Sequence, residues 1–198
     1  MAMGVRSPPD PKVVFREELL KREEIVWFGQ PDPSVIFSKA DILIVPFSFL
    51  WAGFAFFAFG FILVATILAS PAALIALIIA GPMAVVGLYI TIGRFFYKKW
   101  IKRRTHYAVT DHRVLALTLG LTRRLEALEL NSIPAISRSI HPDGTGTLWF
   151  GNAPWWLMLF GNSSMELLAP SGSVPVVFYD IRDAARVYEL VNRMREDE

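Results

Sequence analysis

The sequence contains no cysteine among its 198 residues. A disulfide framework, a thiolate nucleophile and a cysteine-ligated metal site are therefore excluded. A cleavable signal peptide has a short apolar core within about the first 15–30 residues. Here the first long apolar run begins only at Ile42, so we do not expect such a signal.

Charge is also missing over a long stretch, because no Asp, Glu, Lys, Arg or His occurs from Ile42 to Gly93. A soluble helix of that length would lack a solvated face. A bilayer core needs roughly 20 helical residues per crossing, so this block is long enough for two crossings. The sequence therefore predicts a two-helix transmembrane hairpin over 42–93.

The hairpin is expected to turn at Ser70-Pro71. Proline disfavours helix at the preceding residue, and Ser followed by Pro suits the start of a new helix. The predicted spans are 43–69 and 71–93. Neither contains an ionisable group, and proton or ion pathways usually need one, so the hairpin is interpreted as an anchor.

Alanines recur at helical spacing in both spans and predict a close-packed seam between them; the alternative is that alanine is simply common in apolar helices. The seam positions are Ala55, Ala58, Ala65 and Ala69 in the first span and Ala72, Ala76, Ala80 and Ala84 in the second.

The segment 94–104 is strongly basic and is interleaved with aromatic residues. Loops rich in Lys and Arg stay in the cytoplasm, and Trp and Tyr favour the membrane interface. We therefore predict a juxtamembrane anchor, with both termini cytoplasmic, rather than a nucleic-acid site. The predicted membrane-interface residues are Arg94, Tyr97, Lys98, Lys99, Trp100, Lys102, Arg103 and Arg104.

The N-terminal part has two predicted segments. Residues 1–12, "MAMGVRSPPDPK", read as a disordered tail. Residues 13–41 are expected to form an amphipathic helix and a linker at the membrane surface or against the C-terminal domain, since "VFREELLKREEIVWFG" (14–29) places apolar residues on helical faces.

Residues 105–198 show alternating apolar and polar positions, which are typical of strands. A helix with one apolar face follows over 181–195. Antiparallel strands followed by one helix predict a small, partly open β-barrel with the helix closing one end. The predicted strands are 105–111, 112–120, 123–133, 135–141, 146–152, 164–169 and 175–181.

Four segments carry a family resemblance: "EEIVWFGQPDP" (23–33), "RRTHYAVTDHRVLAL" (103–117), "DGTGTLWFG" (143–151) and "FYDIRDAARVYELV" (178–191). In their order and spacing, from about residue 17 onward, they resemble bacterial pleckstrin-homology-like (PH-like) proteins that carry a short transmembrane hairpin. The resemblance implies a seven-stranded, partly open barrel over 105–198, capped by a C-terminal helix. A PH-like fold serves many binding roles, so it implies an architecture rather than an activity.

No catalytic or metal-binding constellation is predicted. His106, His112 and His141 lack the spacing of a metal site. Asp111 beside His112 fits a turn better than acid–base chemistry, because no nucleophile motif accompanies the pair. We therefore expect no cofactor, no metal and no enzymatic activity.

One uncharged aromatic stretch, "GNAPWWLMLFGN" (151–162), stands out within the C-terminal domain. It is predicted to be a loop that dips into the membrane interface; an exposed patch for a protein partner and a buried strand remain alternatives. Its residues are Trp155, Trp156, Leu157, Met158, Leu159 and Phe160.

Together these features predict a multi-pass protein of the bacterial inner membrane. The leading hypothesis is a PH-like interaction module that acts as an adaptor, accessory or assembly subunit of a membrane protein complex. The alternative is a sensor of anionic lipid or membrane stress. Expected partners are membrane lipids, a protein partner and a second copy of the chain, with no role for nucleic acid.

Overall fold

The computed structural model describes residues 10–68, 74–164 and 176–196. The chain divides into two compact units. The β unit comprises Met1–Ser34, Trp100–Pro154 and Gly172–Glu198, and the hairpin unit comprises Val35–Lys99 and Trp155–Ser171. Each unit thus contains segments that are far apart in the sequence.

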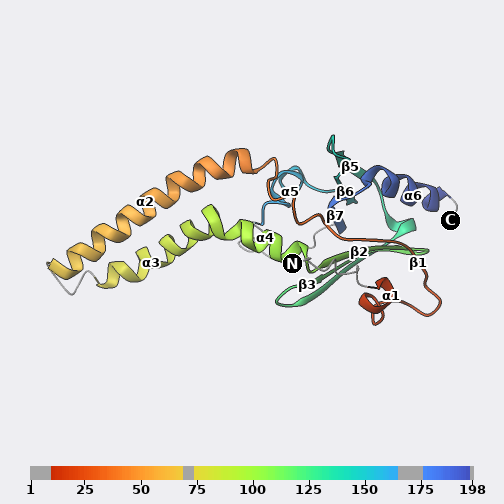
Figure 1. Cartoon of the computed structure of the whole chain (residues 1–198), viewed down its shortest axis with the longest axis horizontal. Coiled ribbons are helices and arrows are strands. Elements are labelled where there is room, and N and C mark those ends of the chain that lie inside the picture. The colour runs from red at the N-terminus through yellow and green to blue at the C-terminus, as the bar shows by residue number, and fades with distance from the viewer. Residues whose placement is uncertain (1–9, 69–73, 165–175, 197–198) are drawn as a thin grey trace, which may run out of the picture. The chain divides into compact units, whose positions relative to one another are not determined.

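The β unit contains two antiparallel sheets (Figure 1). Sheet A has the strand order β1-β2-β3-β4 and sheet B the order β5-β6-β7. A short 3-10 helix, η3, spans Leu130–Ser132, and helix α6 spans Ala184–Glu196. The strands are β1 Ile25–Gly29, β2 Thr105–Thr110, β3 Arg113–Leu119, β4 Arg123–Glu129, β5 Ile136–Ile140, β6 Gly146–Phe150 and β7 Val176–Ile181.

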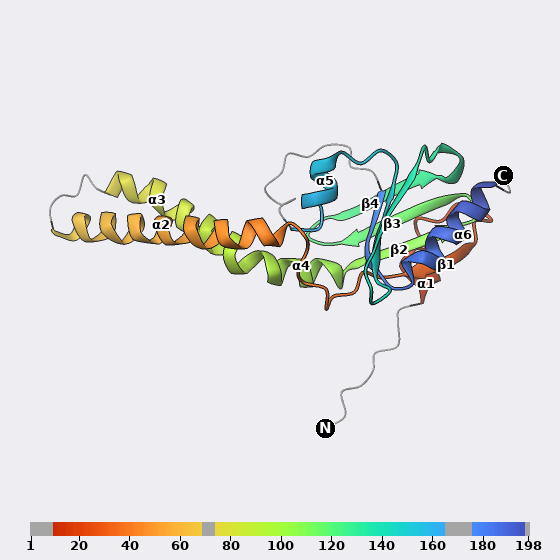
Figure 2. The same ribbon diagram turned by 90° about the horizontal axis from the view of Figure 1, so that it is seen from above.

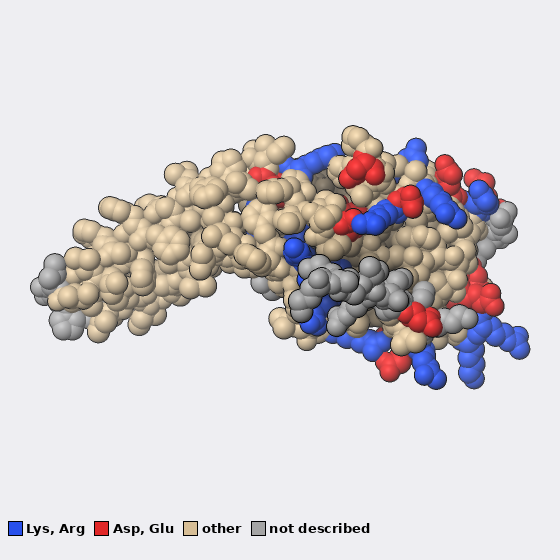
Figure 3. All heavy atoms as spheres, in the orientation of Figure 1, with Lys and Arg blue, Asp and Glu red and all other residues tan. Residues whose placement is uncertain are grey.

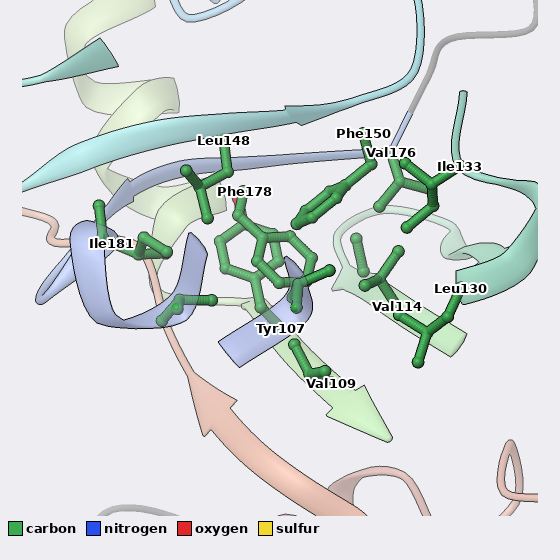
Figure 4. Close-up of a cluster of buried hydrophobic side chains, with 14 residues drawn as sticks. Tyr107, Val109, Val114, Leu130, Ile133, Leu148, Phe150, Val176, Phe178 and Ile181 are labelled. Carbon is green, nitrogen blue, oxygen red and sulfur yellow. The ribbon is translucent and has the colours of Figure 1, made fainter. Parts of the chain in front are cut away.

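The main core of the β unit lies among the strands β2, β3, β6 and β7 and the helix α6. Its centre is aromatic: Tyr107 stacks on Phe178 with ring centroids 4.5 Å apart, and Phe150 meets Phe178 edge-on at 4.8 Å. Figure 4 shows these side chains pointing toward one another. Helix α6 closes the core with the apolar face that its sequence predicts, burying Ala184, Val187 and Val191 fully.

Six of the predicted strands are present with slightly shorter bounds, and so is the C-terminal helix. The predicted strand 164–169 lies outside the described residues except for Ser164, which is in a turn. The seventh observed strand is instead β1, at 25–29. The domain therefore does not consist of 105–198 alone.

The prediction of an amphipathic helix within 13–41 is wrong. Only α1, Pro11–Val14, is helical there, and Arg22 adopts a left-handed φ of 71° that interrupts any longer helix. The β-branched and aromatic residues of "IVWFG" suit a pleated, half-buried surface, and β1 pairs antiparallel with β2. Phe15, fully buried, packs on the second face of sheet A against Ala108, Leu115 and Leu117.

In the hairpin unit, α2 spans Asp41–Leu68 and α3 spans Leu74–Leu88. A π-helical turn, η2 (Tyr89–Gly93), and α4 (Arg94–Lys102) continue α3. The long helices lie side by side in both views (Figures 1 and 2). The predicted turn at Ser70-Pro71 lies outside the described residues. The second helix does not end at 93 as predicted but continues to Lys102.

Two helices are long and apolar enough to cross a membrane, Asp41–Ile67 and Leu74–Lys102. Within their most apolar windows only 11% and 22% of the residues are buried inside the protein. Figure 3 shows a face of α2 and α3 that carries no acidic or basic side chain along most of its length. Large apolar side chains such as Phe57, Ile67 and Ile78 are about three-quarters exposed.

The seam between α2 and α3 is made of small residues. Ala52 and Ala55 on α2 and Ala80, Ala84 and Gly87 on α3 are buried. A Cβ at Gly87 would lie 3.3 Å from the Cα of Ala52, so the backbones approach closely. The predicted seam is thus present at Ala55, Ala80 and Ala84; Ala69 and Ala72 lie outside the described residues.

Candidate functional site

Asp41 and Arg94 are the first charged residues on either side of the uncharged block. An antiparallel hairpin brings such positions together, and the structure pairs Arg94 Nη1 with Asp41 Oδ1. Both side chains are almost fully buried, with 1% and 4% exposure. The pair is therefore an internal ion pair at the base of the hairpin, the end where α2 begins and η2 ends.

Each member of this pair has further partners. Asp41 Oδ2 accepts hydrogen bonds from the Ser38 amide at 2.5 Å and the Ser38 hydroxyl at 2.9 Å, as the acidic residue of a capping box does at the start of a helix. Arg94 Nε donates to the Ile90 carbonyl at 2.7 Å, and its Nη1 lies 3.4 Å from the Ser163 carbonyl. Buried charges need such partners to offset lost hydration.

The π-helical turn η2 lies directly before Arg94. π-Turns are rare and occur frequently at functional sites. Here Tyr89, the first residue of η2, donates its hydroxyl to the Ser164 carbonyl at 2.8 Å. Within the described part of the chain, Arg94 Nη2 is buried without a hydrogen-bond partner. The base of the hairpin is thus the most polar and least regular part of this unit.

Three basic residues of α4 are spaced four apart and share one helix face: Arg94, Lys98 and Lys102. All three are buried. Within the hairpin unit, Lys98 Nζ donates to the Ile36 carbonyl at 2.8 Å. Within the β unit, Lys102 Nζ lies 2.5 Å from Asp180 Oδ2.

The Lys102–Asp180 pair belongs to a second buried cluster. Lys102 Nζ also approaches the Asp32 carbonyl at 3.3 Å, and the Asp32 amide donates to the Asp180 carbonyl at 2.8 Å. The Ser34 hydroxyl and amide and the Arg182 guanidinium donate to the Asp32 carboxylate, and together they outweigh its burial and lower the pKa of Asp32 to about 2. This cluster joins the segment after β1 to the end of β7.

These contacts correct the prediction that residues 94–104 form one basic group at the membrane surface. Arg94, Lys98 and Lys102 are neutralised or hydrogen-bonded inside the protein. The remaining charges are exposed, and Tyr97 and Trp100 are half-buried; Arg104 covers the Trp100 ring at 4.6 Å. The exposed basic residues are Lys99, Arg103 and Arg104. The four-residue spacing shows that Arg94, Lys98 and Lys102 share a helix face, but it does not show that this face is buried.

The aromatic stretch is neither a loop nor a strand but a short helix, α5 (Trp155–Phe160). A helix divides the stretch between two faces. Trp155 and Met158 are 74% and 42% exposed, whereas Leu157 is buried. Leu159 and Phe160 pack against Ala40, Ile44 and Ile90. The side chain of Trp156 lies outside the described part of the structure.

A further charged cluster, which the sequence reading did not detect, connects the N-terminal segment to the β2–β3 hairpin. Arg113 Nε and Nη2 each lie 2.8 Å from a carboxylate oxygen of Glu23. Thr110 and the Leu20 amide also donate to that carboxylate. Burial alone would raise the pKa of Glu23, but these hydrogen bonds and the Arg113 charge outweigh it and lower the pKa to about 2.

The histidines stay apart. His106 is buried, stacks on Phe28 with centroids 5.9 Å apart, and contacts Gln30 Nε2 through Nδ1 at 3.0 Å; burial lowers the pKa of His106. His112 lies in the exposed β2–β3 turn beside Asp111. Among the described residues no group of three His, Asp or Glu side chains could hold a metal ion.

Comparison with protein-family models, curated proteins and solved structures finds no match for this chain. Function must therefore be inferred from the chain's own contacts. The most informative features are the exposed apolar surface of α2 and α3 and the buried charges where that surface ends.

Proposed function

We propose that this chain is anchored in the bacterial inner membrane by the α2–α3 hairpin and carries a PH-like interaction module on the cytoplasmic side. The module would act as an adaptor, accessory or assembly subunit of a membrane protein complex. The exposed apolar surface of the hairpin carries this proposal. Transferring one large apolar side chain out of water contributes about 1.5–3 kcal/mol, and soluble proteins rarely leave patches of this extent exposed.

Strand pairing supports an even number of crossings. The hairpin is inserted between β1 and β2, which are hydrogen-bonded neighbours in sheet A. A chain that leaves one strand, crosses the bilayer and returns to pair with it must end on the side where it started. The exposed basic residues after α3 favour the cytoplasm as that side.

The internal ion pairs support an anchor rather than a transport pathway. Arg94 is neutralised by Asp41, and Lys102 by Asp180. Charges that take part in transport usually face a water-filled cavity, whereas each of these two pairs is buried within its own unit. The Asp41–Arg94 pair stabilises one geometry at the base of the hairpin.

The adaptor role draws on α5 and on the β unit. Exposed Trp155, together with Met158, belongs to the residue types that dominate binding energy at protein interfaces. The two antiparallel sheets of four and three strands and the C-terminal helix are the elements that a PH-like module requires. Such a fold serves chiefly as a rigid platform for binding surfaces.

Membrane topology can be tested in the full chain because it has no native cysteine. Single variants Ser34→Cys, Ala185→Cys and Ile67→Cys would be treated with a membrane-impermeant maleimide in inverted and right-side-out vesicles. We expect Ser34→Cys and Ala185→Cys to react only in inverted vesicles, and Ile67→Cys to react in neither or only in right-side-out ones. Labelling of Ser34→Cys and Ala185→Cys from opposite sides would reject the hairpin topology.

Partner binding can be tested by affinity purification of the full chain from membranes in mild detergent. We expect a stoichiometric membrane protein to co-purify, and Trp155→Ser to reduce its recovery. Leu20→Ser is the control, since it removes another largely exposed apolar side chain (60%, against 74% for Trp155) from the N-terminal segment. Equal recovery with both variants and the parent would reject α5 as the binding surface.

The second candidate function, a sensor of anionic lipid, is favoured by the exposed charges of Lys99, Arg103 and Arg104. Each basic residue near an anionic surface contributes on the order of 1 kcal/mol. The test is whether the near-ultraviolet circular dichroism of the chain changes with the phosphatidylglycerol content of proteoliposomes. A change that disappears when the three residues are replaced by Gln would favour the sensor over the adaptor.

A further inference from the structure

Strand β4 lies at an open edge of sheet A. It has one hydrogen-bonded neighbour, β3, and no backbone hydrogen bond joins it to any other described element. Natural proteins protect such edges with short strands, proline, bulges or charged side chains, because an open edge pairs with other chains; β4 has only charged side chains of this kind, and these have opposite signs. β4 has seven residues, no Pro or Gly, and an uninterrupted register with β3.

The other edge strands of the two sheets differ from β4. β1 and β5 have five residues each. β1 has a register shift against β2, and β7 has one against β6. Among the described edges, β4 is therefore the longest, and like β5 it keeps an uninterrupted register with its neighbour.

The side chains of β4 are self-complementary. Leu128 packs on the main core and Leu125 on the opposite face of sheet A, so Arg124 and Glu126 share the face of Leu128. If a second β4 runs antiparallel with Leu125 opposite Leu125, each Arg124 lies opposite a Glu126. Centring the pair on Glu126 would instead oppose two carboxylates, and centring it on Ala127 would form no ion pair. Cross-strand pairs of opposite charge and of apolar residues stabilise sheets, and like charges destabilise them.

We propose that two copies of this chain associate through β4, paired antiparallel about Leu125, so that two four-stranded sheets become one continuous sheet. The interface is isologous: each copy offers the same strand, and each Arg124 meets the partner's Glu126. It requires no rearrangement of either sheet. It is also independent of the adaptor and sensor roles, since it uses none of their residues.

The environment of Glu126 is consistent with this pairing. Its side chain is 26% exposed, and among the described residues it forms an ion pair with Arg124 of the same strand at 3.0 Å. Burial raises the pKa of Glu126 and Arg124 offsets this only in part. A second guanidinium from the partner strand would supply the missing charge.

A cysteine at the two-fold axis tests the register in this cysteine-free chain. Residues directly opposite in an antiparallel pair have Cβ atoms about 4.5–5.5 Å apart, within reach of a disulfide. Leu125→Cys should therefore crosslink two copies under mild oxidation in proteoliposomes of phosphatidylethanolamine and phosphatidylglycerol. Ala127→Cys is the matched control: it lies on the same strand face, but its two copies would be offset by four residues, about 13 Å.

We expect disulfide-linked dimer from Leu125→Cys in excess of that from Ala127→Cys on the order of tenfold, with both variants retaining the parent's circular dichroism. Equal crosslinking of both variants would indicate random collision in the bilayer and overturn the proposal. Crosslinking of Ala127→Cys alone, or of neither, would overturn it as well. These outcomes leave the proposed membrane function unaffected.

Charge reversal provides a second, independent test. Arg124→Glu and Glu126→Arg should each abolish dimers on their own, because each places like charges opposite each other across the two-fold axis. Mixing the two variants should restore dimers, because every Glu of one copy then meets an Arg of the other. The ion pair within one strand cannot produce this rescue. The rescue is measured as hetero-dimer by differential tagging in micelles, and a mixture that forms no hetero-dimer would reject the register.

Discussion

The buried carboxylate of Glu23 is expected to make the β unit sensitive to acid. Its two oxygens accept hydrogen bonds from Arg113, from the Thr110 hydroxyl and from the Leu20 amide, at 2.7–2.8 Å. They hold the N-terminal segment against the turn between β2 and β3. The perturbation is Glu23→Gln, which keeps the shape of the side chain but removes its charge.

The magnitude follows from the pKa of Glu23, which falls from 4.5 to about 2 on folding. One pKa unit corresponds to 1.36 kcal/mol, so the ionised group contributes about 3 kcal/mol. Because the folded pKa is depressed, this contribution is fully present above about pH 4.5. It is lost as the pH falls from there toward 2. Glu23→Gln should therefore lower the free energy of unfolding by about 3 kcal/mol at pH 7, and the difference should vanish near pH 2.

The assay is urea unfolding of the full chain in detergent micelles at several pH values, followed by near-ultraviolet circular dichroism. Glu24→Gln is the matched control: the neighbouring side chain is exposed, and its loss should change the unfolding free energy by less than about 0.5 kcal/mol. The difference between parent and Glu23→Gln isolates this one group from the other carboxylates. A difference that stays constant between pH 7 and pH 2 would refute the reasoning.

Three further predictions concern the other buried groups. Asp41→Leu or Arg94→Met alone should each destabilise the hairpin by about 3–5 kcal/mol, and combining the two changes should cost less than either single change; additive losses in thermal unfolding would contradict a paired role. Because burial lowers the pKa of His106, stability should fall as the pH drops through 6.5, the unfolded value, and His106→Phe should flatten the unfolding free energy between pH 7 and 5; an unchanged slope would argue against this. Gly87→Leu should disrupt the helix seam, whereas Gly81→Leu, with no atom within 4 Å of its added Cβ, should not; equal melting temperatures in micelles would contradict the packing.

Local patterns in the sequence were sufficient for much of the fold. An uncharged block interrupted by Ser70-Pro71 predicted two apolar helices, because crossing length and charge are properties of a single segment. The alternating positions of β2 and β3, and the apolar face of α6, were likewise visible without knowledge of their partners. The predicted elements that the structure retains are those whose signal lies within one continuous stretch.

Elements that depend on distant partners were missed or misassigned. The residues of β1 fit either a short amphipathic helix or a strand, and the choice depends on β2, which follows the whole hairpin in sequence. α5 was misread because an apolar run of six residues has no decisive period. The burial of Lys98 and Lys102 depends on carbonyl and carboxylate groups that no pattern in 94–104 reveals.

The insertion of the hairpin between β1 and β2 also implies an order of folding. Before the hairpin forms, pairing β1 with β2 must close a loop that includes every residue between Gly29 and Thr105. Once α2 and α3 are associated and Asp41 is paired with Arg94, only the short segments that flank the helices remain flexible. Because closure entropy grows with the logarithm of loop length, this lowers the cost of pairing by about 1.5 kcal/mol. The Asp41–Arg94 pair therefore contributes to forming sheet A even though it belongs to the other unit. In a variant that lacks the pair, the folding rate of the β1–β2 pair should fall by a larger factor than its unfolding rate rises.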